Sequence, residues 1–329
     1  MTVDDLAIGS PDLPSTVTLA RPRRQRQLLL VEDQPGPIVK WPGGKTRILD
    51  DLIACLPPDW ADGSAPGCYF EPFSGGAALF FHLRPTSAVL SDTNKDLIEL
   101  YAEIARDPSG LHAQAAELAR AHVADPASYY VVRDAWNVDR GKWKAQRRAA
   151  AFLYLNKACF NGLFRVNKAG KFNVPIGRSS GSGASWPRMP SAAQLVAAQG
   201  ALRDARLCCA DFVEVVADAT RGDLVYFDPP YMPASRTASF TSYSRLGFGP
   251  RDHEELARVA RDLVDRGVRV MLSSADVPAA RELYRGLEIS EIRCDRSIGA
   301  SGASRGRVGE LIVTGGYDRI ASASAGVRS

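Results

Sequence analysis

Asp228-Pro229-Pro230-Tyr231 is the segment of this 329-residue chain with the clearest potential for chemistry. It directly follows the apolar run Leu224–Phe227, a pattern typical of a buried strand. Two successive prolines restrict the backbone and keep Asp228 out of the helical region. A carboxylate and a rigid carbonyl are both acceptors, which suits an amine with two protons such as N6 of adenine, and the tyrosine ring offers a face for stacking. Taken alone, the tetrapeptide fits an ordinary capped turn equally well.

A glycine turn, EPFSGGA over residues 71–77, follows a second apolar run, Cys68–Phe70. Glycines let the backbone approach a ligand closely, and a helix is expected from Ala77, although the spacing is not that of the dinucleotide fingerprint. Asp92 lies just after the next expected strand, Ala88–Leu90, at the position where a nucleoside-binding fold holds ribose hydroxyls. A tight turn without a ligand remains the alternative for the glycines alone.

A third segment, KWPGGKT over residues 40–46, resembles the end of a phosphate-binding loop. That motif requires a glycine where Val39 stands. Because nothing else in the chain supports nucleotide hydrolysis, we reject an ATPase.

An alternation of short apolar runs and helical periodicity surrounds these segments. It predicts a mostly parallel sheet with crossover helices, an α/β fold. The expected strands are Cys68–Phe70, Ala88–Leu90, Leu207–Ala210, Leu224–Phe227, Arg269–Ser273, Leu287–Ile292 and Glu310–Thr314. The expected helices are Lys45–Cys55, Asp252–Asp265 and Ala279–Tyr284.

One stretch interrupts this alternation with helical patterns at Leu97–Ala105, Leu111–His122 and Trp143–Leu155, followed by a loop-rich part. We infer an inserted, mainly helical domain over 97–200. The α/β domain then comprises 37–96 and 201–320. Residues 1–36, with four prolines and no clear period, and residues 321–329 are predicted to be flexible tails.

Charge is concentrated in this insertion. The whole chain carries a net charge of +4, but residues 131–190 hold twelve Lys and Arg against two acids, a local charge of +10. Such a basic block in a near-neutral chain indicates a phosphate-binding surface. A solvated helix face without a partner is the alternative.

Hydrophobicity and cysteine spacing exclude several classes. No apolar run reaches the roughly 18 residues of a membrane span, and the apolar stretch near the start is too short for a signal peptide, so a cytoplasmic protein is expected. Six cysteines without a C-x-x-C pair favour reduced thiols over a metal site.

Seven segments together resemble the DNA adenine-N6 methyltransferase family, in order along most of the chain. They are KWPGGK at 40–45, EPFSGGAALFF at 71–81, SDTNKDL at 91–97, LNKACFNGLFRVNKAGKFNVPIG at 155–177, DF at 211–212, YFDPPYMPASRTASFTSY at 226–243 and RGRVGELIVTG at 305–315. The resemblance implies a Rossmann-like methyltransferase sheet with an inserted, mainly helical target-recognition domain. Ala77 stands where a glycine is common in the family, and Ser273-Ser274-Ala275 where many members have Ser-Asn.

The resemblance also implies S-adenosyl-L-methionine as cofactor and double-stranded DNA as partner, with no metal and no membrane. The implied cofactor-binding residues are Trp41, Lys45, Phe73, Gly75, Asp92, Asp211, Phe212 and Asp228. The implied catalytic residues, which hold a flipped-out adenine, are Asp228, Pro229, Pro230 and Tyr231. The implied DNA-binding residues are Lys40, Asn161, Leu163, Arg165 and Pro175.

Several alternatives remain open at this point. An RNA adenine methyltransferase shares the chemistry, a silent nucleic-acid-binding protein shares the fold, and a small-molecule methyltransferase has no use for the basic insertion. Arg165 is expected to read guanine, with a phosphate contact as its alternative, whereas Lys142, Lys144 and Lys171 suit phosphates. The resemblance points to GATC as the recognition sequence. A monomer is expected, with a dimer on DNA as the alternative. A restriction partner, a housekeeping role and a phage role are not distinguished.

Overall fold

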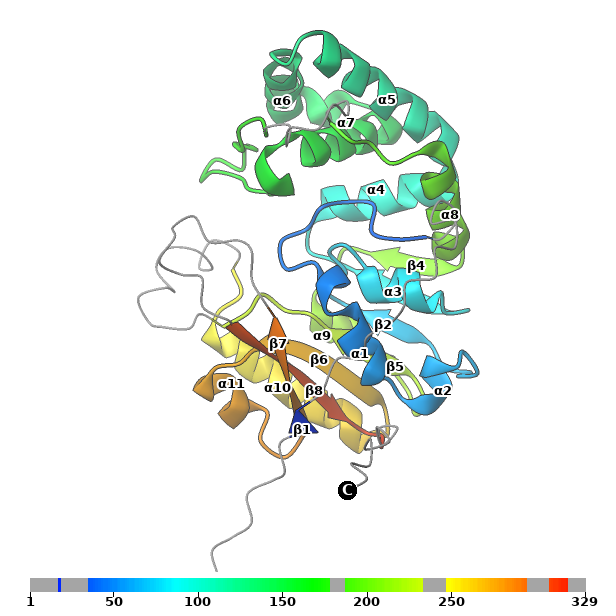
Figure 1. Ribbon diagram of the computed structural model, residues 1–329, viewed down its shortest axis with the longest axis vertical. Helices are drawn as coiled ribbons and strands as arrows, with labels where there is room; N and C mark the ends of the chain where they lie inside the picture. The colour runs from blue at the N-terminus through cyan, green and yellow to red at the C-terminus, as the bar shows by residue number, and fades with distance from the viewer. Residues whose placement is uncertain (1–16, 19–34, 178–186, 233–246, 295–307, 319–329) are drawn as a thin grey trace, which may run out of the picture.

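The computed structural model describes residues 17–18, 35–177, 187–232, 247–294 and 308–318. Their strands form one sheet in the order β1-β7-β8-β6-β5-β2-β3-β4 (Figure 1). Neighbouring strands are parallel except where β8 pairs antiparallel with β6 and β7. The bounds are β1 Val17–Thr18, β2 Tyr69–Glu71, β3 Ala88–Ser91, β4 Ala205–Cys208, β5 Leu224–Phe227, β6 Arg269–Ala275, β7 Glu288–Cys294 and β8 Val308–Gly315. The predicted α/β fold is confirmed.

Alternate residues of each central strand face opposite sides of the sheet, as the pleat requires. Tyr69 and Tyr226 pack into one hydrophobic cluster, and their neighbours Phe70 and Val225 pack into the other. The first cluster is covered by α1 and α3, and the second by α9, α10 and α11. Because both faces are buried, the strands read as continuous apolar runs. The helix bounds are η2 Lys45–Arg47, α1 Leu49–Ala54, α2 Pro58–Ala61, α3 Ala78–Leu83, α9 Phe212–Val215, α10 Pro250–Asp265 and α11 Pro278–Leu283.

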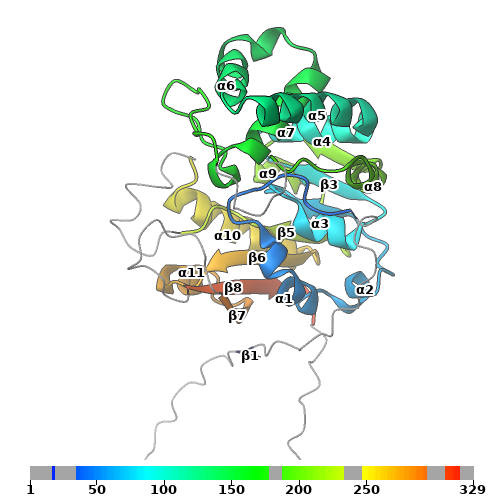
Figure 2. The same ribbon diagram turned by 45° about the horizontal axis from the view of Figure 1, so that its top comes forward.

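Helices α4 to α8 lie between β3 and β4 in the chain, where the insertion over 97–200 is predicted, and gather at one end of the molecule (Figures 1 and 2). Helix α7 is buried along 149–156 and contacts α4, α5 and α6, so it is the central helix of this region. The three helices predicted here are confirmed, whereas α6 and α8 were not predicted. The bounds are α4 Lys95–Arg106, α5 Pro108–Ala124, α6 Ser128–Asp139, η3 Arg140–Lys142, α7 Ala145–Ala158, η4 Phe160–Gly162 and α8 Ala192–Leu202.

The chain order of the strands defines where a ligand belongs. From β2 the chain proceeds outward through β3 and β4, and then returns to the other side of β2 to form β5 and β6. The order therefore reverses between β2 and β5, and ligands of open α/β sheets bind outside the carboxyl ends of the strands at such a point. Glu71, Ser91 and Phe227 end β2, β3 and β5 at this edge.

Part of the predicted N-terminal tail differs from expectation. Val17–Thr18 form β1, which pairs in parallel with Ser290 and Glu291 of β7. The edge of a sheet has unpaired backbone groups, and these two residues pair with those of β7. Residues 1–16, 19–34 and 319–329, which make up most of both predicted tails, lie outside the described residues.

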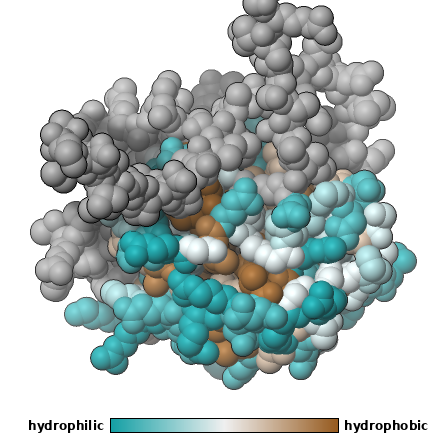
Figure 3. All heavy atoms as spheres, turned by 90° about the horizontal axis from the view of Figure 1, so that it is seen from below, coloured by the Kyte–Doolittle hydropathy of each residue, from teal (hydrophilic) through white to brown (hydrophobic). Residues whose placement is uncertain are grey.

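Large apolar side chains that the described residues expose to solvent all lie between Val123 and Val196, in the helical region. Where Figure 3 shows described residues at the opposite end, they are mainly hydrophilic around a central apolar area. None of the helices in the described part of the chain is long and apolar enough to cross a membrane.

Candidate active site

Asp228 and Lys45 form the centre of the site at the carboxyl end of β5. Lys45 Nζ lies 2.7 Å from Asp228 Oδ1, and the two side chains are only 7% and 18% exposed. The contact is a short, largely buried ion pair. Burial raises the pKa of Asp228 to about 6, although the Lys45 charge opposes this shift. The site therefore holds two opposite charges that are partly removed from water, at the place where a ligand is expected.

Tyr231 lies beside this ion pair. The Lys45 ammonium lies 4.9 Å from the centroid of the Tyr231 ring, and the Tyr231 hydroxyl donates a hydrogen bond of 2.9 Å to Glu310 Oε2. Pro229 is buried and Pro230 is half-buried between them. All four residues of the predicted catalytic tetrapeptide thus lie at the sheet edge, with Asp228 and Tyr231 both in contact with Lys45.

The glycine turn lies next to Asp92. Gly75 N donates to Asp92 Oδ2 at 3.1 Å, and Asn94 N donates to Asp92 Oδ1 at 2.8 Å. Burial raises the pKa of the Asp92 carboxyl. Tyr101 of α4 donates to Gly75 O at 2.6 Å, so the insertion's first helix also holds the turn.

Gly75 is required where it stands for two reasons. Its φ is 44°, which favours glycine, and a Cβ there would lie only 2.6 Å from Trp41 Cδ1. The close approach brings the KWPGGK segment and the glycine turn together. The Trp41 ring also stacks on Phe164 of the insertion, with ring centroids 6.2 Å apart and an interplanar angle of 16°.

Aromatic rings form the other flank of the site. Phe73 stacks on Phe212 with centroids 5.5 Å apart, and Phe248 packs edge-on against Phe73 at 5.6 Å. Asp211 accepts a hydrogen bond of 2.9 Å from Val213 N and caps α9, while its side chain remains exposed. Flat apolar rings beside an exposed acceptor are suited to a purine base.

The predicted DNA-binding residues lie together, on the insertion and on the segment that it holds. Asn156 of α7 accepts from Lys40 N at 2.9 Å and donates to Lys40 O at 2.8 Å. Gly162, with a φ of 66°, approaches Lys40 so closely that a Cβ would lie 2.3 Å from Lys40 Cβ. Asn161 also adopts a left-handed conformation, with a φ of 54°. These contacts join Lys40 to the loop that carries Asn161 and Leu163.

A short hairpin follows this loop. Val166 pairs with Phe172, and Asn167 N donates to Lys171 O at 2.9 Å. Arg165 is exposed at its base, and its Nε donates to Asn173 Oδ1 at 3.0 Å. Pro175, also exposed, completes the predicted set.

Two acidic residues at the site received no role from sequence reasoning. Glu71 is 2% exposed, accepts from the Tyr69 hydroxyl at 2.8 Å, and has its pKa raised to about 8 by burial. It is therefore mainly protonated at neutral pH, which leaves Asp228 as the charged partner of Lys45. Glu310 holds the Tyr231 hydroxyl. Both lie inside the family-like segments, but their spacing carries no signal of a side-chain contact.

Both departures from the family pattern occur at ordered positions. Ala77 has a φ of 51° and a ψ of 40° as it precedes α3, a conformation in which glycine is favoured, which accounts for the family's usual residue. Ser273 is fully buried on β6, and its hydroxyl lies 2.8 Å from the Tyr226 hydroxyl.

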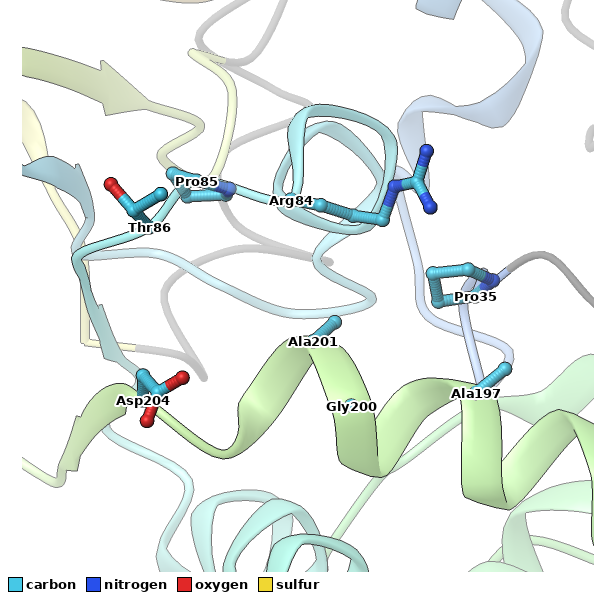
Figure 4. Close-up of a pocket in the computed structure, with 8 residues that line it drawn as sticks. All are labelled: Pro35, Arg84, Pro85, Thr86, Ala197, Gly200, Ala201 and Asp204. Atoms are coloured by element: carbon cyan, nitrogen blue, oxygen red, sulfur yellow. The ribbon is translucent and has the colours of Figure 1, made fainter. Parts of the chain in front are cut away.

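A separate hollow lies between the loop after α3 and helix α8 (Figure 4). Its lining combines small and apolar residues with Arg84 and Asp204. None of the predicted site residues lines this hollow. The candidate active site is therefore the cluster at the carboxyl edge of the sheet. No group of three metal-ligating side chains occurs among the described residues.

Comparison with known proteins shows the family to which the chain belongs. Residues 41–298 match the D12 class of N6 adenine-specific DNA methyltransferases. The chain is 37% identical to the Type II methyltransferase M1.LlaDCHI of Lactococcus lactis subsp. cremoris, over 84% of this chain and 94% of that protein. It is 35% identical to the Type II methyltransferase M.MjaIII of Methanocaldococcus jannaschii, over 82% and 94%. It is also 35% identical to the DNA adenine methylase of Escherichia coli K12, over 83% and 93%.

The chain therefore belongs to the D12 class of N6 adenine-specific DNA methyltransferases. It is a site-specific DNA methyltransferase that acts on adenine. The family implies a methyl donor of the S-adenosylmethionine type and DNA as the substrate.

Proposed function

We propose that this methyltransferase binds S-adenosyl-L-methionine along the carboxyl edge of β2, β3 and β4 and grips a flipped-out adenine at Asp228-Pro229-Pro230-Tyr231. The observation that carries the proposal is the cluster in which Lys45 contacts both Asp228 and Tyr231. This cluster lies at the reversal in strand order between β2 and β5. The target amine and the cofactor would therefore meet at Asp228.

The residues of this chain fit such a cofactor. Phe73 and Phe212 supply flat apolar surface for its adenine, and Asp92 supplies acceptor oxygens for the ribose hydroxyls. Lys45 supplies a positive charge for the carboxylate of its methionine part. The Ser74 hydroxyl, buried in the glycine turn, has no hydrogen-bond partner among the described residues, as expected of a turn built to meet a ligand.

Asp228 and the Pro229 carbonyl would accept the two N–H bonds of the adenine amine. This arrangement favours a pyramidal nitrogen whose lone pair points away from both acceptors. When bound, S-adenosylmethionine supplies a methyl carbon activated by its sulfonium. Holding the amine in line can contribute roughly 7–11 kcal/mol to the acceleration. Asp228, which is ionised above pH 6, can then hold the proton that the methylated amine releases.

Activity should depend on the ionisation of Asp228. Its pKa is raised to about 6 in the folded protein, so the carboxylate that accepts the amine is present above pH 6 and lost as the pH falls through that value. Below this pH we expect kcat/KM to fall about tenfold per pH unit, because a single group must be ionised. The parameter to measure is kcat/KM, since it reports the ionisation of groups in the free enzyme. A pH profile of kcat/KM measures this, and a rate that stays constant down to pH 5 would contradict it.

The insertion would hold the DNA. The adenine N6 is inaccessible inside a duplex, so the base must leave the stack at a cost of about a few kcal/mol. Phe160, whose side chain is 48% exposed next to Asn161, offers an aromatic surface at this loop. Lys168 and Lys171 are exposed on the hairpin and suit phosphates, whereas Lys142 is paired with Asp139 at 2.8 Å.

Arg165 should read a base rather than only grip the backbone. A guanidinium can bond O6 and N7 of guanine at once, which is worth roughly 1–3 kcal/mol of discrimination. We expect Arg165→Ala to raise activity on single-base variants of the preferred site relative to that site. Methylation rates on the full set of variants measure this change.

The double variant Lys168→Ala/Lys171→Ala is the matched comparison for Arg165, because phosphates carry no sequence information. It should weaken binding to all DNA alike and reduce the salt dependence by a slope of about 0.9 per lost contact. If Arg165→Ala slows every site by the same factor, Arg165 is a phosphate ligand and does not read the sequence.

Sequencing of methylated bases in DNA exposed to the protein tests the proposed function as a whole. N6-methyladenine in one sequence context is the expected product, and GATC stays the predicted context. Duplex DNA and RNA compared as substrates separate this proposal from an RNA methyltransferase. Calorimetric titration with S-adenosylmethionine separates it from a silent DNA-binding protein, which would show no heat of binding.

A further inference from the structure

Glu310 reaches the active site from a strand that sequence reasoning connected only with the fold. It lies near the start of β8, in register with Ala275 of β6 and Ile292 of β7. Its Oε2 accepts the Tyr231 hydroxyl at 2.9 Å, across 79 residues of sequence. A hydroxyl-to-carboxylate bond is charge-assisted and directional, so it restricts the orientation of the ring that it holds.

A second contact acts on the same ring from another direction. The Lys45 ammonium lies 4.9 Å from the Tyr231 ring centroid, and Lys45 in turn pairs with Asp228. The hydroxyl end is held by Glu310, and the ring itself faces the ion pair. Glu310 contacts Tyr231 without being part of the acceptor pair that meets the amine.

We propose that Glu310 is a positioning residue for methyl transfer, which fixes the Tyr231 ring through its hydroxyl and thereby orients the stacked adenine over Asp228. The inference rests on the proposed role of Tyr231 as the stacking surface. It also explains why a tyrosine is useful there: a phenylalanine would stack equally well but would lack the hydroxyl that Glu310 holds.

The charge of Glu310 adds a second, separable effect. The groups that act on Asp228 are Lys45 of η2, whose charge lowers its pKa, and Glu310 of β8, which raises it together with burial. Glu71 of β2 is mainly neutral at pH 7 because burial raises its own pKa to about 8. Removal of the Glu310 charge should therefore move the acid limb of the activity profile to lower pH.

The test compares Glu310→Ala, Glu310→Gln, Tyr231→Phe and the double variant Glu310→Ala/Tyr231→Phe. Glu310→Ala should lower the single-turnover methylation rate by roughly tenfold, the scale of a hydrogen bond to a charged group, with little change in the Kd for duplex DNA. Glu310→Gln keeps an acceptor for the hydroxyl and should restore most of the rate. Both Glu310 variants should show the same acid shift of the pH profile, because both lose the charge.

The double variant provides the decisive comparison. If Glu310 acts through the Tyr231 hydroxyl, Tyr231→Phe should match Glu310→Ala and the double variant should be no slower than either. Additive losses, an unchanged rate in Glu310→Ala, or a loss that follows a fall in the folded fraction would each overturn the proposal.

Glu288→Gln is the matched control. Glu288 pairs with Thr314 at the other end of the β7–β8 ladder, four residue pairs or about 13 Å from the Glu310 position. The methylation rate of the Glu288→Gln variant should equal that of the unmodified protein. Asp228→Ala distinguishes the two levels of inference. An active Asp228→Ala protein would remove the proposed site itself, whereas an inactive one together with a normal Glu310→Ala protein would remove only the role of Glu310.

Discussion

Replacing Asp228 with alanine is expected to reduce methyl transfer at least 100-fold while the fold is retained. Asp228 is the charged acceptor at the carboxyl end of β5, and its neighbour Glu71 is mainly protonated at neutral pH. Removal of one preorganised group that hydrogen-bonds the reacting atoms costs about 10²–10³ in kcat. The Pro229 carbonyl alone cannot orient both N–H bonds of the amine. Single-turnover transfer of labelled methyl to duplex DNA measures the effect.

Asp276→Ala is the control for this variant. Asp276 follows β6 at the same sheet edge but is paired with Arg281 at 2.8 Å, so its loss should affect stability without changing the rate per folded molecule. Thermal unfolding of both variants separates the two effects. An Asp228→Ala protein that keeps more than a few per cent of the activity would exclude Asp228 from the chemistry.

Replacing Lys45 or Asp92 with alanine should weaken S-adenosylmethionine binding by about 1.5–3 kcal/mol each, the range for hydrogen bonds to charged groups. This corresponds to roughly a 10- to 150-fold rise in Kd. Lys45 is the buried positive charge at the site, and Asp92 offers its carboxylate beside the glycine turn. Titration calorimetry with the isolated protein measures both.

Two further variants guard against indirect effects. Asp92 also accepts the Gly75 N–H, so Asp92→Ala could loosen the turn, whereas Asp92→Asn keeps an acceptor there and removes only the charge. Lys95→Ala removes an exposed lysine next to the Asn94 helix cap and should leave the affinity unchanged. Unchanged affinity in both Lys45→Ala and Asp92→Ala would place the cofactor elsewhere.

The class of fold and the segments of the site could be predicted from the sequence because both depend on local patterns. A buried strand such as Leu224–Phe227 is a continuous apolar run whatever lies beside it, and it was predicted with its observed bounds. The carboxyl end of such a strand faces a ligand edge in every open α/β sheet. The type of residue that follows, Asp228, therefore already indicated the kind of chemistry.

Elements with weak periodicity were harder to predict. Helix α8, Ala192–Leu202, is so rich in alanine that apolar residues lie on all its faces, and β1 consists of two residues inside a proline-rich segment. Helix α6 buries only Tyr129 and Trp136, too few to produce a clear stripe. Such elements are stabilised mainly by packing against neighbouring parts of the fold. A local sequence pattern does not contain that information.

The contacts that tune the site were decided only by the tertiary structure. Asn156 is hydrogen-bonded to the Lys40 backbone across 116 residues of sequence, and Glu310 is hydrogen-bonded to the Tyr231 hydroxyl across 79. Each partner is an ordinary polar residue in its own segment. Burial likewise raises the pKa of Glu71 and Asp228 because packing removes water from them, and packing involves all layers of the fold at once. The sequence thus determined which groups are present, and the fold decided which of them are charged, held and brought within reach of one another.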